Sequence, residues 1–179
     1  MPGSGKGLLK EILEKEFKVP VITMSEVLRK RYEKEKMGDE RLMDYAFRLR
    51  QMFGRGVVAR MCIEEIKGLN YDIVAFDGVR NWEEVEEFSK VGDVVIIAVH
   101  SPRALRYERL IKRGRADDPK DYESFVRRDF EELNMGIGTV ISLADYIIVN
   151  DSTVDEFKVR AIEVLNKIIY GKDSRKDGS

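Results

Sequence analysis

The chain has 179 residues with one cysteine and one histidine, and its 32 basic and 33 acidic residues give a formal net charge of −1 at pH 7. This length suits one domain that buries its own core, and the balanced charge excludes bulk attraction to nucleic acid. Cys62 and His100 alone build neither a disulfide framework nor a cysteine or histidine metal cluster, and without a signal peptide or a membrane-length apolar run we expect a cytoplasmic protein with no membrane partner.

Short apolar runs alternate with longer amphipathic segments. The runs expected to form strands are continuously apolar, as in strands covered on both faces. They span residues 19–22, 73–76, 94–99 and 146–149. The segments expected to form helices place apolar side chains about 3.6 residues apart. They span residues 5–17, 39–53, 56–68, 102–112 and 153–170. This alternation predicts an α/β fold, a parallel sheet with helices on both faces.

The first segment of the chain is rich in glycine, with the sequence MPGSGKG at residues 1–7. Glycines let consecutive amides point inward, and Lys6 and the start of the following helix add positive charge, which suits phosphates. A complete phosphate loop has a further glycine, which would sit just before Met1, and a Ser or Thr after the lysine, where this chain has Gly7. A flexible glycine-rich terminus is the alternative interpretation.

The strand that precedes such a loop lies in the middle of the sheet, and this chain does not contain it. Its absence leaves backbone groups of both neighbouring strands unpaired, at about 1 to 3 kcal/mol each. Several such groups rival the stability of a whole domain, about 5 to 15 kcal/mol. We therefore expect Met1 to be an internal methionine that follows an upstream strand ending in glycine.

Further along the chain, four segments carry residues suited to a phosphate site. They are ITMSEVLR at 22–29, DGVR at 77–80, the arginine-rich run at 109–128 and ADYIIVND at 144–151. Asp77 follows an apolar run, so we expect it at the carboxyl end of a strand, where α/β sheets bind ligands and a carboxylate can hold Mg²⁺ through water. Arg109 and Arg113 are four residues apart, so they share one helical face. Solvated arginines and ordinary turns are the alternative interpretations.

Together, from Gly3 to about Phe157, these motifs resemble nucleotide kinases of the adenylate kinase type, most closely the archaeal adenylate-kinase-related family. The resemblance implies the three-layer P-loop fold in one domain at residues 1–170, with an acceptor-side helical clamp at 39–68 and a short lid at 113–128. Residues 171–179 are expected to form a disordered tail. ATP and Mg²⁺ are the implied cofactors, small nucleotides the implied partners, and the protein a monomer or small homo-oligomer.

The implied activity is transfer of the ATP γ-phosphoryl group to a nucleotide or a similar small phosphorylated acceptor. A nucleotide-binding switch or an ATPase without kinase turnover is the alternative, favoured by Leu8 in the position of the family threonine. Phosphoryl transfer spreads negative charge over equatorial oxygens, so converging cations do the work by positioning and stabilisation.

The resemblance also implies individual roles. The residues expected to bind ATP are Gly3, Ser4, Gly5, Lys6, Gly7, Arg109 and Asn150, and Asp77 would hold Mg²⁺ through water. The residues expected to act in catalysis are Lys6, Arg80, Arg113 and Arg128, with Arg127 as the alternative to Arg128. The residues expected to bind the acceptor are Arg29, Arg80 and Glu84. Glu84 replaces a family glutamine that reads the acceptor base, which argues against simple AMP recognition. For Asn150, a turn that caps the last helix is an equal alternative.

Overall fold

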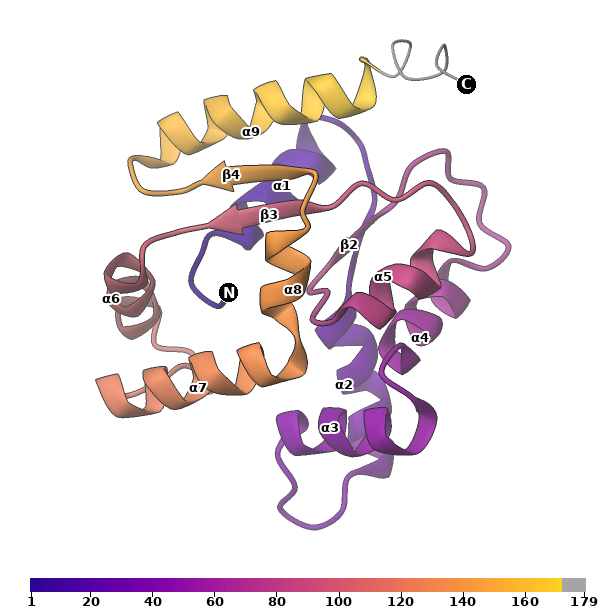
Figure 1. Ribbon diagram of the computed structural model, residues 1–179, viewed down its shortest axis with the longest axis vertical. Helices are drawn as coiled ribbons and strands as arrows, with labels where there is room; N and C mark the ends of the chain where they lie inside the picture. Colours follow the sequence, from indigo (N-terminus) through magenta and orange to yellow (C-terminus); the bar gives the residue numbers. More distant parts are fainter. Residues whose placement is uncertain (172–179) are drawn as a thin grey trace.

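The strands are short and parallel, and they form two separate pairs. In the computed structural model, which describes residues 1–171, β1 (Val21–Thr23) pairs with β2 (Ala75–Asp77) (Figure 1). β3 (Ile97–His100) pairs with β4 (Tyr146–Val149). Within residues 1–171 no ladder joins one pair to the other. The α/β P-loop fold with parallel strands is confirmed.

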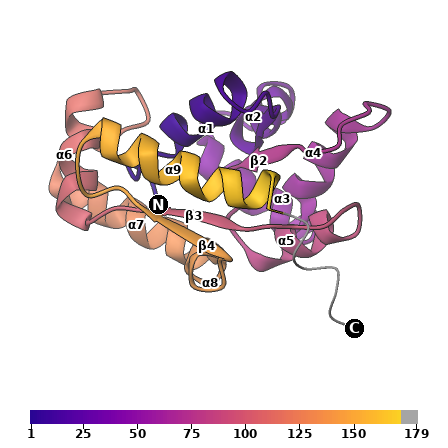
Figure 2. The same ribbon diagram turned by 90° about the horizontal axis from the view of Figure 1, so that it is seen from above.

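Helices fill the connections between the strands. They are α1 (Lys6–Lys15), α2 (Met24–Glu35), α3 (Leu42–Phe53), α4 (Val57–Ile66), α5 (Trp82–Ser89), α6 (Arg103–Arg113), α7 (Tyr122–Met135), α8 (Ile137–Ser142) and α9 (Val154–Ile169). Figure 2 shows α1 and α9 on one side of the strands and α8 and α5 on the other. None of the helices in the described part of the chain is long and apolar enough to cross a membrane.

The core has two parts. One part joins α2, α3 and α4 around residues such as Tyr45 and Cys62, which are fully buried. The other joins α1 and α9 to β3 and β4 around Phe157 and Ile148. Cys62 is therefore a core residue, and burial raises the pKa of its thiol to about 12.

Each expected strand and helix is present, but the strands differ at their ends. Residues 73–74 and 94–96 were expected within strands, and they lie outside the ladders. The first ladder begins only after Pro20, which has no N–H to donate; its carbonyl accepts from the N–H of Ala75 at 2.9 Å. The expected tail lies, apart from Gly171, outside the described residues.

Candidate phosphate site at the carboxyl ends of the strands

The N-terminal loop lies beside the carboxyl ends of the strands. Asp77 is the last residue of β2, and Asn150 follows β4 directly. The Asn150 side-chain amide donates to the carbonyl of Ser4 at 2.9 Å, which ties the loop to the end of β4. Gly5 has φ +103°, a conformation that side chains rarely adopt, and a Cβ there would lie 2.1 Å from Asn150 Nδ2. The glycine thus lets the loop approach the strand end.

Arg109 on α6 extends this contact. Its guanidinium donates to the Asn150 side-chain oxygen at 3.2 Å and to the hydroxyl of Ser101 at 2.9 Å. The Ser101 hydroxyl in turn donates to the backbone carbonyl of Asn150. Arg109 and Asn150, both expected at the ATP site, therefore lie in contact, and both support the loop that begins the chain.

A buried ion pair supports the loop from the other side. The Arg106 guanidinium donates to both carboxylate oxygens of Asp129, at 2.8 and 2.6 Å, and to the carbonyl of Pro2 at 3.2 Å. Such two-pronged pairing fixes the direction of the guanidinium. Neither residue was predicted from the sequence, although Arg106 shares its helical face with Arg109 and Arg113 through spacings of three and four.

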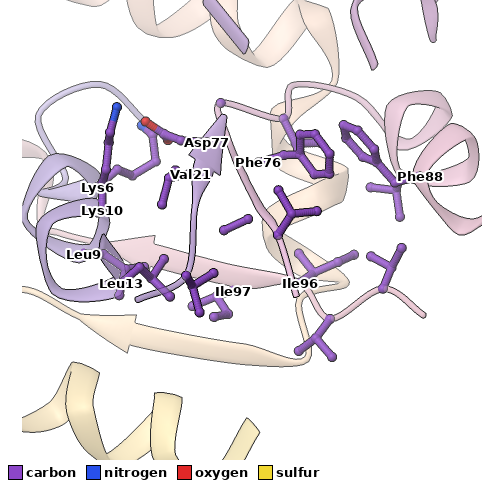
Figure 3. A pocket seen from close by; sticks show the side chains of 18 of the residues that line it. Lys6, Leu9, Lys10, Leu13, Val21, Phe76, Asp77, Phe88, Ile96 and Ile97 are labelled. Atoms are coloured by element: carbon purple, nitrogen blue, oxygen red, sulfur yellow. The ribbon is translucent and has the colours of Figure 1, made fainter. Parts of the chain in front are cut away.

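Lys6, the first residue of α1, and Asp77 line the same end of a cavity of about 540 Å³ (Figure 3). Burial lowers the pKa of Lys6 below its ordinary value, and Asp77 opposes this shift. Three arginines lower it further; they are Arg80, Arg128 and Arg113. The structure thus brings the expected lysine, carboxylate and three arginines into one electrostatic neighbourhood. An anion bound there would attract all of these cations and offset the repulsion among them.

Arg80 is held between two carboxylates. Its guanidinium pairs with Glu132 of α7, which is fully buried, and its backbone N–H donates to Glu84 at 2.7 Å. Burial lowers the pKa of Arg80 to about 10, and repulsion from Arg50 adds to the shift. One carboxylate oxygen of Glu132 is buried without a hydrogen-bond partner within the described residues. The Arg80 side chain is therefore held in place, and the unpaired oxygen of Glu132 beside it can accept one more hydrogen bond.

Glu84 lies inside the protein. Its side chain is 0% exposed; Oε1 accepts from Arg50 on α3 at 2.7 Å, and Oε2 accepts the Arg80 N–H. Its own N–H donates to the side chain of Asn81, the N-cap of α5. In this arrangement the carboxylate does not face an acceptor base, because both oxygens are already paired with protein donors. The expected base-reading role finds no support in this geometry.

Two expected catalytic arginines share one carboxylate. Arg113, at the end of α6, donates to Asp118 at 2.8 Å, and Arg128 on α7 lies 3.5 Å from the same carboxylate. The Asp118 side chain is 1% exposed. Arg128 also donates to the carbonyl of Asp117 at 2.6 Å. Asp118, which was given no role from the sequence, thus ties together the two ends of the segment expected to be a lid.

Arg29 and Leu8 lie apart from this cluster. Arg29 is exposed on α2, and in the described part of the chain it has no hydrogen bond or ion pair. Leu8, in the position of the family threonine, packs against the core formed by α1, α9, β3 and β4. The residue after Gly7 thus offers the site no hydroxyl.

Comparisons with known proteins find a matching family model and several similar chains. A family model described as "AAA domain" matches residues 1–126, a range that includes the loop, Asp77, Arg80 and Arg113. The chain is 60% identical over 169 residues to a UPF0200 protein of Sulfurisphaera tokodaii, with 94% of each chain covered. It is 55% identical over 171 residues to a UPF0200 protein of Saccharolobus islandicus, covering 94% of this chain and 90% of the relative. A UPF0200 protein of Pyrococcus abyssi is 44% identical over 178 residues, with coverages of 95% and 94%.

Proposed function

Because the chain belongs to the UPF0200 family and carries a nucleotide-binding domain of the P-loop type, we propose that it binds ATP with Mg²⁺ and transfers the γ-phosphoryl group to a small phosphorylated acceptor. The observation that carries this proposal is the convergence of Lys6, Asp77 and the arginines beside one glycine loop. Cations at the start of a helix, next to a loop of backbone amides, are the groups that hold phosphates.

The residues present fit a bound polyphosphate. The hydroxyl of Ser4 is buried and has no hydrogen-bond partner within residues 1–171. A buried hydroxyl without a partner is costly, and a phosphate oxygen would supply the missing acceptor. Asp77, at the end of β2, supplies the carboxylate that Mg²⁺ prefers, acting through water. When bound, the ion would neutralise part of the charge on the phosphate oxygens.

In this proposal, the donor phosphates rest on the amides of residues 3–7 and on Lys6. Arg80 stabilises the charge that develops on the transferring group, while Glu132 keeps its guanidinium in place. Arg113 and Arg128 exchange their shared carboxylate, Asp118, for phosphate oxygens as the segment 113–128 closes. Closure of this kind excludes water, which would otherwise hydrolyse the donor.

The remaining assignments concern the two ends of the site. Arg109 and Asn150 stand beside the donor base, and they also hold the loop. Arg29, exposed on α2 after β1, is free to meet the acceptor phosphate when the helical clamp at 39–68 moves. Glu84 organises Arg50 and Arg80 rather than touching the acceptor.

The test is the formation of ADP from ATP and Mg²⁺, with and without each member of a panel of nucleoside monophosphates and dephospho-coenzyme A. We expect ADP only when an acceptor is present, together with a phosphorylated acceptor in equal amount. Lys6→Ala is expected to abolish ADP formation, and this loss would exclude a contaminating kinase. Lys15→Ala, the matched control, is expected to retain it.

A nucleotide switch or ATPase is the second candidate, favoured by the packing of Leu8 where the family has a hydroxyl. It predicts slow ADP release that no acceptor accelerates. That result, with Lys6 still required, would replace phosphoryl transfer by hydrolysis as the function of this site.

A further inference from the structure

The turn between α3 and α4 contacts two other parts of the protein through Arg55. The Arg55 guanidinium donates to the backbone carbonyl of Met135, the last residue of α7, at 2.7 Å, and it pairs with Glu83 of α5 at 2.8 Å. The backbone carbonyl of Arg55 accepts from the side-chain amide of Asn81, which is fully buried, at 3.3 Å. Arg55 therefore fastens the helical clamp at 39–68 to the start of α5 and to the end of α7.

These contacts meet at Gly136, where the packing is tight. Gly136 follows α7 directly and has φ +107°, a conformation that side chains rarely adopt. A Cβ there would lie 2.8 Å from Arg55 Nη2, 3.3 Å from Asn81 Cβ and 3.5 Å from the carbonyl oxygen of Arg80. The glycine thus lets the helical clamp, the loop that carries Arg80 and the end of α7 come into contact.

The same contacts form a closed ring around Arg80. The Arg80 N–H donates to Glu84, and the Glu84 N–H donates to the side chain of Asn81 at 2.9 Å. Asn81 donates to Arg55, which donates to the end of α7. The ring closes because Glu132, one turn before the end of α7, pairs with the Arg80 guanidinium. The backbone and the side chain of Arg80 are therefore held from two directions, and Arg55 joins the two.

From this ring we propose that Arg55 is a positioning residue for Arg80. It holds the loop that carries Arg80 against the end of α7 that carries Glu132, so that the guanidinium faces the transferring phosphoryl group. This inference rests on the proposed phosphoryl transfer. Arg80 and Glu132 line the cavity of the phosphate site, whereas Arg55 does not. Arg55 therefore acts through Arg80, and its loss affects transfer of the phosphoryl group rather than binding of ATP.

The chemistry of arginine suits this place. The last carbonyls of a helix lack partners within the helix and carry partial negative charge, which favours a cation there. The planar guanidinium also donates in two directions at once, here to the Met135 carbonyl and to the Glu83 carboxylate. A lysine keeps the charge but lacks this fork of donors, so Arg55→Lys separates the effect of charge from the effect of geometry.

The experiment compares Arg55→Ala with Arg60→Ala in the assay of ADP formation. Arg60 is a matched control, because it also joins the helical clamp to α5, through Glu87 at 2.8 Å, and its side chain is 44% exposed where that of Arg55 is 48% exposed. The kcat, the KM for the acceptor and the Kd for ATP are measured for each variant. Hydrogen exchange followed by mass spectrometry gives the protection of residues 78–84 and 133–138, a measurement that does not require turnover.

We expect Arg55→Ala to lower kcat by about 10- to 100-fold, because a small displacement of a group that stabilises the transition state has effects of this size. The Kd for ATP should stay unchanged, and exchange at both segments should become faster. Arg60→Ala should change neither kcat nor exchange at these segments. Arg55→Lys should fall between the original protein and Arg55→Ala in both measurements.

A double-mutant cycle tests whether Arg55 acts through Arg80. In a protein that carries Arg80→Lys, adding Arg55→Ala should lower kcat by about twofold or less, because the side chain that Arg55 positions is already gone. An equal fall of kcat with and without Arg80→Lys would overturn the proposal, since a general loss of structure lowers kcat whichever residue stands at position 80. An unchanged kcat in Arg55→Ala, with the original protein active, would overturn it too.

Failure of the proposed function gives a different result. The original protein would then form no ADP with any acceptor, so the phosphoryl transfer itself would be refuted. Exchange would still show whether Arg55 holds the loop that carries Arg80, and unchanged exchange in Arg55→Ala would refute that role as well.

Discussion

Single side chains set the charge of the site, and they differ in what holds them. Arg80 and Arg113 each pair with a carboxylate that is almost completely buried, Glu132 and Asp118. Lys6 has only a long contact, 3.5 Å, to the carbonyl of Met1. The protein therefore compensates the charge of Lys6 less directly than the charges of Arg80 and Arg113.

Replacing this lysine is expected to affect ligand binding and stability in opposite directions. Lys6→Ala should weaken ATP binding by about 10- to 100-fold, the range for a hydrogen bond to a charged group. It should leave the free energy of unfolding unchanged or higher, because burial already disfavours the charged amine. Lys15→Ala, an exposed lysine at the end of α1, should alter neither. Displacement of a fluorescent ATP analogue and urea unfolding measure the two effects. A Lys6→Ala protein that binds ATP normally would remove the lysine from the site.

Substitutions of the neighbouring residues Glu84 and Glu83 test whether Glu84 stabilises the fold or binds the acceptor. Glu84→Gln leaves Arg50 buried without its counter-charge, so we expect a loss of about 3 kcal/mol in the free energy of unfolding. Glu83→Gln removes a half-exposed pair with Arg55 and should cost less than about 1 kcal/mol. Urea unfolding of both variants provides the comparison. Unchanged stability in Glu84→Gln, together with a raised KM for the acceptor, would instead place its carboxylate against the acceptor base.

Among the elements, the phosphate loop depends on what approaches it from α6 and β4. Asn150 and Arg109 hold one side of the loop, and Arg106 holds the other. Gly5 permits the close contact with Asn150, whereas a Cβ at Gly7 would meet nothing within 4 Å. A side chain is therefore excluded at Gly5 but has room at Gly7, although both glycines belong to the same motif.

Alanine substitutions at Gly5 and Gly7 test this difference. Gly5→Ala should destabilise the protein by about 1 to 3 kcal/mol and weaken ATP binding, because the alanine must adopt a strained backbone and displace Asn150. Gly7→Ala keeps the backbone amide and lies in the first turn of α1, so it should be neutral or stabilising by up to about 1 kcal/mol. Thermal unfolding with and without ATP measures both. Equal effects of the two substitutions would show that the loop does not depend on the contact with Asn150.

Local sequence patterns predicted the helices and strands better than they predicted the contacts between them. The expected helices at 39–53 and 153–170 correspond to α3 and α9, whereas α5, which Asn81 caps, was not among the expected helices. Ser101 resembles a cap as well, but α6 begins after Pro102, and the Ser101 hydroxyl bonds Asn150 instead. Glu132 and Arg50 reach the site from α7 and α3, far away in sequence. No local pattern marks such residues, because their role exists only once the helices have packed.

For the molecule as a whole, the fold follows from alternating apolar runs, and the structure shows where the sheet is interrupted, because within residues 1–171 no ladder joins β2 to β3. The apolar runs at 73–76 and 94–99 contain residues that find no ladder partner. A cavity lies between these two runs, so no other strand within the described residues lies close enough to pair with their facing edges.

The dependence of stability on pH follows from the buried α-amine of Met1. Burial lowers the pKa of this amine from its ordinary value of 8.0, which applies to the unfolded chain, to about 5 in the folded protein. Between these two values the unfolded chain binds more protons, so stability rises from pH 5 to pH 8 and falls on acidification. Relative to an Nα-acetylated form, the chain should lose about 1.4 kcal/mol per pH unit on going from pH 8 towards pH 5. Urea unfolding of both forms across this range is the measurement; parallel curves would contradict the burial of the amine.

The most direct test of the account is a calorimetric titration of the protein with ATP in the presence of Mg²⁺. We predict one site per chain, an affinity that falls as salt rises, because cations supply the binding, and a gain of about 2.7 kcal/mol in stability at a ligand concentration 100 times the Kd. An absence of saturable binding at millimolar ATP, with the protein shown to be folded, would contradict the assignment of the loop, Lys6 and the arginines to a nucleotide phosphate site.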